Sequence, residues 1–203
     1  YGKPLMRPLF FEEANNYQLF NYSKAYLWGN DILVSPVLEA GKIKQNVYFP
    51  EDNVWFDFYT GEKFEGGQTK SVDLKENSIP TFVRAGSFIP IAKPSQNTVA
   101  YDNSFIELHY YFDNSAPENE RTLYTDNGSD INSNRIGNYE VMDFESKYRG
   151  ANLKFEFSSH LFHEYGLTIT PKDKMVDFVI HNIQKEPKYI KVDDEKVMSF
   201  LVL

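Results

Sequence analysis

Residues 55–90 read WFDFYTGEKFEGGQTKSVDLKENSIPTFVRAGSFIP, a succession of short apolar runs separated by turn residues. Thr60-Gly61 and Gly66-Gly67 favour turns, because glycine reaches backbone conformations that other residues resist. The runs between them are rich in aromatic and β-branched residues, which pack well on a pleated, half-buried surface. Several such runs at short intervals predict a β-sandwich or barrel-like module.

The chain on either side of this stretch continues the pattern. Strands are predicted at residues 32–34, 37–38, 47–49, 106–110, 153–157, 176–180 and 200–203. In the longer of these, apolar and polar residues alternate, which gives one buried and one wetter face. Asp126-Asn127-Gly128 predicts a tight hairpin. Residues 93–103 are polar with one proline, so we predict a linker there.

The N-terminal residues have a different pattern. Leu9-Phe10-Phe11 is an uninterrupted apolar run within PLMRPLFFEE (residues 4–13), which predicts a strand buried on both faces, as in a parallel sheet. No βα repeat accompanies it. Residues 15–28 predict the one helix of the chain, with Gly29 as its stop. Left uncovered, Phe10 and Phe11 would form the kind of patch that marks an interface.

Composition excludes several classes of partner. Of 203 residues, 41% are hydrophobic, as in a globular protein, and the net charge is −8. Phosphate binding needs a basic face, so we expect no nucleic acid, and the same charge argues against an anionic membrane. No apolar run reaches a membrane span of about 18 residues, and no leader peptide is visible. There is no cysteine, so cysteine usage does not indicate whether the protein works in an oxidising or a reducing compartment.

Acidic residues are abundant, but their spacing offers no catalytic pair. Glu12-Glu13 and residues 193–195 are adjacent runs, and neighbouring side chains on a strand point to opposite faces. We therefore predict solvated surface for both runs. Glu12 is the exception, because it follows a barrel-like strand at the end where barrel active sites form, so a supporting role in an active site is open.

Two short segments resemble metal sites only in part. His160 and His163 have a spacing that suits a metal on a helix, but the surrounding residues predict a strand and turn, without a third ligand. Residues 126–130 offer oxygens to calcium, yet they lack the spacing of an EF-hand and read as a turn. We predict no metal and no cofactor. Trp28 and Trp55 are predicted to be core residues rather than sugar-stacking platforms.

The segments from residue 7 to residue 90 resemble, in order, a known family. They are RPLFFE (7–12), WGNDILVSPVL (28–38), VYFP (47–50), WFDFYTG (55–61) and IPTFVRAGSFIP (79–90). The series is similar to the end of the barrel and the following β domain of glycoside hydrolase family 31. The segment LYTDNG (123–128) resembles the hairpin of the family's distal domain, with Thr125 and Asn127 where the family favours acids.

This resemblance implies a mainly β fold of two consecutive antiparallel β-sandwich domains. They would follow the last strand and short helix of a truncated (β/α)8 barrel. The implied division is 1–28 for the barrel remnant, 29–92 for the proximal sandwich, 93–103 for the linker and 104–203 for the distal sandwich. The chain begins with Tyr1 rather than Met, which we interpret as a piece of a longer protein.

The implied function is that of a non-catalytic accessory region of a retaining α-glycosidase acting on α-glucosides, α-xylosides or related sugars. Retention needs two carboxyl groups about 5–5.5 Å apart. No position matches the family's catalytic motifs, so we assign no catalytic residue and leave substrate-binding residues open. The expected partners are the upstream catalytic barrel and its carbohydrate substrate. The alternatives are a carbohydrate-binding module, marked by a row of exposed coplanar rings, and a structural or interaction module.

Overall fold

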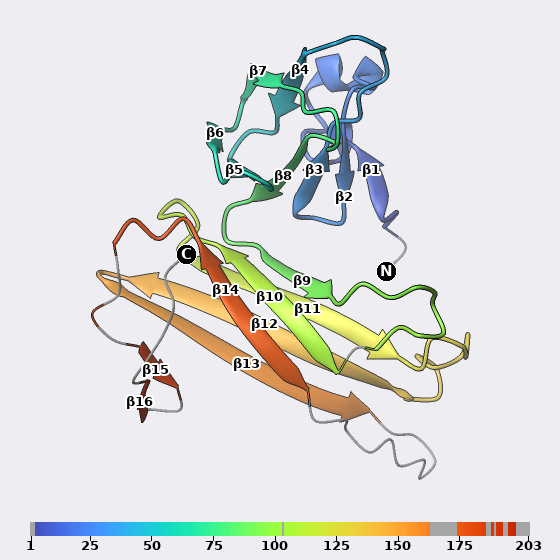
Figure 1. Ribbon diagram of the computed structural model, residues 1–203, viewed down its shortest axis with the longest axis vertical. Coiled ribbons are helices and arrows are strands. Elements are labelled where there is room, and N and C mark those ends of the chain that lie inside the picture. Colours follow the sequence, from blue (N-terminus) through green and yellow to red (C-terminus); the bar gives the residue numbers. More distant parts are fainter. Residues whose placement is uncertain are drawn as a thin grey trace.

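The computed structural model describes residues 3–102, 104–162, 174–185, 188, 190–192 and 195–197. Strands dominate these residues, and Figure 1 shows short strands β1 to β8 gathered above the long strands β9 to β14. We call these two groups the proximal module and the distal module. Two short 3-10 helices, η1 (Leu9–Phe11) and η2 (Tyr17–Asn21), lie in the proximal module. The predicted mainly β fold is confirmed.

The proximal module has two layers. One is an antiparallel sheet with the spatial order β1 (Met6–Pro8), β2 (Tyr26–Trp28), β3 (Ile32–Val34), β8 (Thr81–Arg84), β5 (Val54–Asp57) and β6 (Lys63–Glu65). The other is an antiparallel pair formed by β4 (Lys44–Phe49) and β7 (Gln68–Asp73). Alternate residues of both layers turn inward, so the apolar side chains meet between them.

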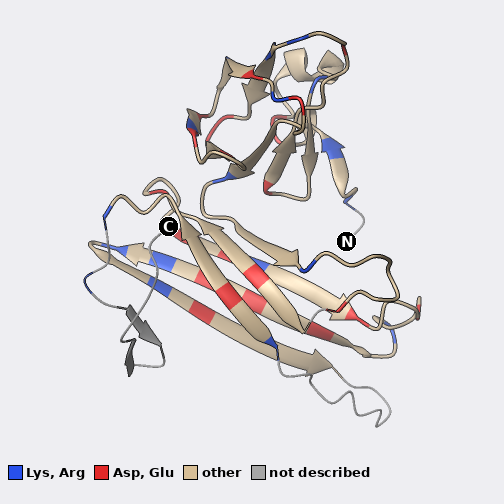
Figure 2. Cartoon of the chain, in the orientation of Figure 1, with Lys and Arg blue, Asp and Glu red and all other residues tan. Residues whose placement is uncertain are grey.

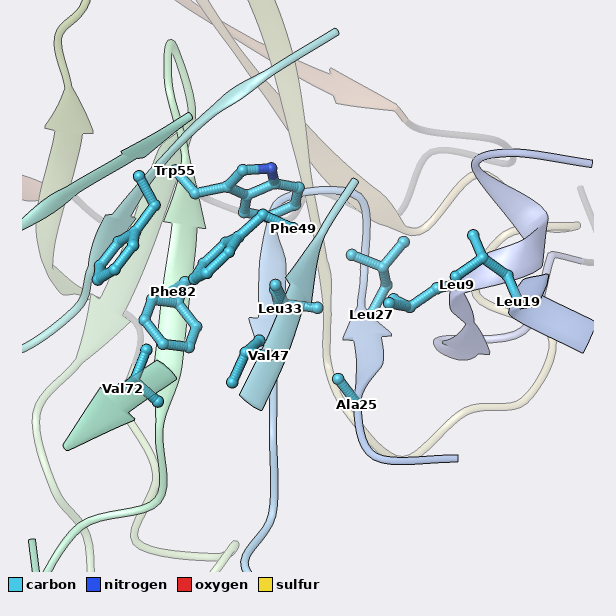
Figure 3. Close-up of a cluster of buried hydrophobic side chains, with 11 residues drawn as sticks. Leu9, Leu19, Ala25, Leu27, Leu33, Val47, Phe49, Trp55, Val72 and Phe82 are labelled. Carbon is cyan, nitrogen blue, oxygen red and sulfur yellow. The ribbon is translucent and has the colours of Figure 1, made fainter. Parts of the chain in front are cut away.

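The core of the proximal module lies between these layers (Figure 3). Phe49 of β4 stacks on Phe64 of β6 with ring centroids 4.6 Å apart, and Phe82 of β8 meets both rings edge-on. Trp55 is fully buried, and its indole N–H donates to the Pro50 carbonyl at 3.2 Å. The polar atom of the indole is therefore satisfied within the core.

The distal module is a sandwich of two three-stranded sheets. One sheet has the order β14 (Met175–His181), β10 (Phe105–Tyr111) and β9 (Phe88–Ala92). The other has the order β11 (Glu118–Asp126), β12 (Tyr139–Arg149) and β13 (Asn152–Phe162). Apolar residues from both sheets, among them Leu108, Phe144 and Phe178, form one cluster between them. β15 (Ile190–Val192) and β16 (Glu195–Val197) form a separate pair.

One pair of distal strands departs from the predicted antiparallel arrangement. β10 and β14 are parallel, with Phe105 opposite Met175 and Tyr111 opposite His181. Between them the chain runs through β11, β12 and β13 in the opposite sheet, which are antiparallel to one another. Because β11, β12 and β13 alternate in direction, the chain returns to the first sheet as β14, which runs in the same direction as β10 (Figure 1).

The predictions for the first 28 residues were wrong in detail. The predicted strand at Leu9–Phe11 is the helix η1, and the strand lies earlier, at Met6–Pro8. Instead of one helix over residues 15–28, the structure has the five-residue η2 and the strand β2. Leu27 is buried while its neighbour Trp28 is 51% exposed, which is the alternation of a strand.

Two further predictions were wrong for local reasons. The predicted strand at residues 37–38 is an exposed loop, because Pro36 has no N–H for a ladder and β3 ends at Val34. The predicted tight hairpin at residues 126–128 is the start of a longer connection. Asp126 does pair with Tyr139, but the side chain of Asn127 accepts the amides of Ser129 and Asp130 and turns the chain away.

The strand β9 connects the two modules. It lies within residues 29–92, which the sequence assigns to the proximal sandwich, yet it pairs with β10 of the distal sheet. The division of the chain into four segments stays a prediction. The strand predicted at residues 200–203 lies outside the described part of the chain.

Candidate functional site

The most exposed apolar surface of the proximal module lies on its N-terminal residues. Six large apolar side chains there are between 48% and 78% exposed: Leu5, Met6, Phe11, Tyr17, Phe20 and Trp28. We call these six residues the N-terminal apolar face. Three of its rings are linked through the half-buried Phe10, which stacks on Phe11 and meets Phe20, and Phe20 in turn contacts Tyr17. Exposed apolar surface of this kind marks an interaction site.

The buried carboxylate of Glu13 holds the backbone beneath this surface in place through hydrogen bonds. Glu13 is only 8% exposed, which contradicts the solvated surface predicted for it. It accepts hydrogen bonds from the Asn16 side chain (2.8 Å), the Tyr48 hydroxyl (2.8 Å) and the Glu51 amide (2.8 Å). Burial raises the pKa of the Tyr48 hydroxyl, and the hydrogen bond to Glu13 raises it further. These bonds tie the segment between η1 and η2 to strand β4.

Glu12 points away from Glu13 and belongs to a charged group. Its carboxylate accepts from Arg84 Nη2 at 2.8 Å, and Arg7 Nη2 lies 4.0 Å away. Arg7 is 4% exposed and donates to the Gly29 carbonyl (2.6 Å) and to Asn30 Oδ1 (2.8 Å). The predicted divergence of Glu12 and Glu13 is therefore confirmed. The supporting role predicted for Glu12 in an active site stays a prediction.

The two tryptophans have different environments. Trp55 is fully buried, as predicted, and the Arg84 guanidinium lies 4.8 Å from its ring centroid. Trp28, predicted to be core, is half exposed on β2, opposite Met6 of β1. The prediction for Trp28 was wrong because its strand neighbour Leu27 takes the inward position.

A charged pair joins the proximal and distal modules. Arg121 of β11 holds Asp31 of the β2–β3 turn through two bonds, Nε to Oδ2 at 2.6 Å and Nη2 to Oδ1 at 2.5 Å. The hydrogen bond to Asp31 raises the pKa of the Arg121 guanidinium. Gly86 lies at the same junction with φ of +77°, and a Cβ there would lie 2.3 Å from the Asn119 side chain. A larger residue at position 86 would be strained by the positive φ and would require the Asn119 side chain to shift.

Two hollows lined by described residues offer no facing pair of acids for a sugar ring. One, of about 320 Å³, has a single carboxylate in its lining, Glu39, which is bound to Lys42 at 2.7 Å. Another is lined by Asp57 and Asp73, but its volume of about 20 Å³ is close to that of one water molecule.

The segments weighed as metal sites lie apart. His160 is on the exposed face of β13, 3.8 Å from Asp143, while His163 lies outside the described residues, as do the side chains of residues 193–195. In the part of the chain that the structure describes, no group of three or more His, Cys, Asp or Glu residues converges on a metal position. The same part contains no helix long and apolar enough to cross a membrane.

A row of exposed rings crosses the outer face of the distal sheet. Tyr124, Tyr139 and Phe162 come from β11, β12 and β13, with centroids 5.1 and 4.7 Å apart and interplanar angles of 30° and 17°. The rings stack face to face and so cover one another. The carbohydrate-binding alternative predicts exposed coplanar rings side by side on one sheet face, whereas the rings of this row are stacked on one another.

Sequence reasoning missed two polar groups at the junction. Asp31 and Arg121 are 90 residues apart, and nothing in the pattern pairs them. Glu107, His109 and His181 form the other group, with His109 bonded to both of the others at 2.7 Å. The alternation of residues 106–110 did place Glu107 and His109 on one face, but the parallel pairing that adds His181 has no local signal.

The comparisons with known proteins agree with this architecture. Residues 2–89 match the family model described as the glycosyl hydrolase family 31 C-terminal domain. Alpha-glucosidase 2 of Bacillus thermoamyloliquefaciens is 30% identical over 187 residues, which cover 92% of this chain and 22% of that protein. An alpha-xylosidase of Saccharolobus solfataricus is 34% identical over 110 residues, 54% of this chain and 15% of that protein.

A solved structure extends the likeness to the distal module. The family 31 dextranase of Flavobacterium johnsoniae, complexed with glucose, has a TM-score of 0.79 at 27% identity. The match covers 97% of this chain and 24% of that chain. This chain thus spans less than a quarter of the length of these relatives.

The two packed β modules correspond in fold to the C-terminal region of these larger glycosidases. The chain belongs to glycoside hydrolase family 31, and it corresponds to the C-terminal part of that family's enzymes.

Proposed function

We propose that this chain is the accessory region of a retaining α-glycosidase and supports a catalytic domain that lies elsewhere in the longer protein. The substrate of that protein is an α-linked glucoside or xyloside. Similarity to an alpha-glucosidase and an alpha-xylosidase supports this class of substrate. The single observation that carries the proposal is the family match over residues 2–89.

The N-terminal apolar face is the surface that contacts the catalytic domain in this proposal. Its six side chains are between 48% and 78% exposed, while the buried Glu13 and Arg7 fix the backbone of this segment. Fixing the backbone in advance lowers the entropic cost of forming an interface. Tyr17, at 78%, is the most exposed of its rings, and Phe20, at 51%, contacts it, so docking at this pair would bury additional apolar area.

The non-catalytic role is tested by assaying the chain and the longer protein on aryl α-glucosides and α-xylosides. We expect turnover by the longer protein and none by residues 1–203 alone. Turnover by the purified chain would contradict the proposal.

The docking surface is tested by substitutions made in both contexts. Tyr17→Ser should change the free energy of unfolding of the isolated chain by less than about 1 kcal/mol, because Tyr17 is 78% exposed, and Phe20→Ser should cost about 1–2 kcal/mol there, because Phe20 is half buried. In the longer protein each should cost about 1.5–3 kcal/mol, the value of burying a large apolar side chain.

Ile131→Ser is the matched control, because Ile131 is 97% exposed in the distal module. It should be neutral in both contexts when unfolding is followed in urea. Equal effects of Tyr17→Ser with and without the catalytic domain would refute this docking surface.

A further inference from the structure

Three titratable side chains form a continuous row where the distal module meets the proximal one. Glu107 Oε1 lies 2.7 Å from His109 Nε2, and His109 Nδ1 lies 2.7 Å from His181 Nε2. The row runs from a half-exposed carboxylate on β10 to the last residue of β14. His109 lies between them with a side chain only 14% exposed. We call these three residues the histidine row.

The carboxylate of Glu107 determines which nitrogens of the row donate and which accept. An ionised carboxylate can only accept, so His109 donates from Nε2 to Glu107 and its Nδ1 carries a lone pair. His181 must then donate from Nε2 to His109 Nδ1. In the row with both imidazoles neutral, each ring carries its proton on Nε2, and each bond has one donor and one acceptor.

The inner end of the row is attached to the proximal module. The His181 ring lies between His109, at 4.9 Å, and Tyr111, at 4.4 Å, with interplanar angles of 19° and 11°. Tyr111 is 1% exposed and packs in one cluster with Val54, Phe56 and Val83 of the proximal sheet.

Asn182, the residue after His181, makes a hydrogen bond from the distal module to the proximal module. Asn182 has φ of +64° and donates from its side chain to the Gly61 carbonyl, in the turn between β5 and β6, at 3.1 Å. The position of His181 therefore sets this contact between the modules.

We propose that the histidine row is a pH-dependent contact between the modules. In neutral solution it holds the end of β14 against the β5–β6 turn, and in acid it releases that end. The proposal concerns the junction of this chain and does not rest on any glycosidase activity. Its ligand is the proton, and the element that moves is the segment 181–182 with its contact to Gly61.

The proton count explains why release needs acid. A first proton can bind His181 Nδ1 without loss, because the imidazolium still donates from Nε2 to His109. A second proton must go to His109 Nδ1, the acceptor of that bond. Two N–H groups then face each other across 2.7 Å and both rings carry positive charge, so the bond between the histidines breaks.

Burial opposes charging of the inner histidine. It lowers the pKa of His181, the nearby His109 lowers it further, and only Glu107 acts in the opposite direction. A lowered pKa means that the folded chain binds fewer protons than the unfolded chain near pH 6. The contribution to stability is therefore present above about pH 6.5 and is lost as the pH falls through the folded pKa.

The other elements packed around the histidine row bring few further charged groups near it. On β9, the residues opposite His109 and Glu107 are Ile89 and Ile91. On β14, Asp177 lies opposite Glu107. From the proximal side, burial and then the charge of Asp57 raise the pKa of Tyr111 to about 12, so this tyrosine stays neutral.

One ion pair lies beside the contact that Asn182 makes. Lys63 and Asp113, 2.8 Å apart, join the two modules near Gly61, which is two residues before Lys63. Both keep their charges between pH 5 and 8, because their hydrogen bond and mutual attraction favour the charged forms: the pKa of Lys63 is raised and that of Asp113 lowered. This ion pair therefore adds no titration of its own to that of His181 in this range.

Nitrogen NMR of the 203-residue chain tests the proposal without any variant. Long-range spectra at pH 7.5 should show His109 and His181 both in the Nε2–H tautomer. A His181 ring that carries its proton on Nδ1 at that pH would overturn the proposal.

Amide exchange tests the release itself. The Phe112 amide donates to the His181 carbonyl at 3.2 Å. Its protection factor against hydrogen exchange, which corrects for intrinsic exchange, should fall about fivefold or more between pH 7.5 and pH 5.5. The Arg84 amide, bonded to the Asp31 carbonyl at the other side of the junction, should keep its protection.

His181→Gln keeps an N–H donor for His109 but does not titrate, so the pH dependence at Phe112 should vanish. His160→Gln is the control, since His160 is exposed on β13 and should leave that dependence intact. If the pH dependence of Phe112 were the same in both variants, the row would not be the sensor. His109→Gln supplies the same comparison should His181→Gln fail to fold.

Discussion

The proximal and distal modules reach a packed core by different means. The proximal strands have three to six residues and enclose fully buried rings such as Trp55 and Phe82. In the distal module β11, β12 and β13 have nine to eleven residues, and their ring Phe157 is 46% exposed. Figure 2 shows acidic residues recurring along these long strands, on a sheet with one solvated face.

This difference accounts for the strength of the sequence signal in each module. Short strands need turns, caps and buried charges at fixed places, such as Gly86 and Arg7, and few residues serve there. Long strands need only an alternation of apolar and polar residues, which many sequences supply. The family match covers residues 2–89 and ends within β9, before the long strands β11 to β13 begin.

The largest predicted effect contrasts a buried phenylalanine of the proximal core with a half-exposed phenylalanine of the long strand β13. Phe82→Ala should lower the free energy of unfolding by about 3–5 kcal/mol, because Phe82 is fully buried and packs against Phe49 and Phe64. Phe157→Ala should cost about 1–2 kcal/mol, because nearly half of its surface is already in water. Urea unfolding followed by circular dichroism measures both, and equal losses would remove the contrast between the modules.

The next effect concerns the bond between the modules. Arg121→Gln should cost about 2–3 kcal/mol, since it leaves Asp31, 8% exposed, without its charged partner. Lys44→Gln is the control, because Lys44 and Asp73 form an ion pair with both side chains exposed, and it should cost less than about 0.5 kcal/mol.

A double-mutant cycle with Asp31→Asn isolates the pair. A coupling between Asp31 and Arg121 close to zero would mean that the modules are held together by packing alone.

The smallest predicted effect is a loss of distal stability in acid. Burial alone would raise the pKa of Glu140, but hydrogen bonds from Lys174 and Ser159 outweigh it and hold the pKa below its ordinary value. The stabilisation is therefore present above about pH 4.5 and is lost as the pH falls through the folded pKa. Between pH 5.5 and 3 it should amount to about 1 kcal/mol.

Glu140→Gln removes that titration, so the unfolding free energy of the variant should fall less steeply with acid than that of the parent chain. Unfolding in urea at several pH values measures the two slopes. Parallel slopes would show that Glu140 does not contribute to the acid sensitivity of the distal sandwich.

Sequence reasoning located most strands but misjudged the N-terminal segment. It assigned residues 32–34, 47–49 and 82–83 to strands, because their apolar runs end at turn residues. It extended a helix over residues 15–28 because Leu19, Tyr22 and Leu27 have nearly helical spacing. The same spacing suits a short 3-10 turn followed by a strand, and only contacts with β1 and β3 decide between them.

The amino-acid sequence by itself determined the β class, the family and the positions of most strands, because strand alternation and turn residues act over a few neighbours. Only the tertiary structure decided which groups meet across the modules. The pairing of Asp31 with Arg121 and the row from Glu107 to His181 join residues that are 90 and 74 positions apart. Such pairs depend on how whole sheets pack, and no local pattern of residues encodes that distance.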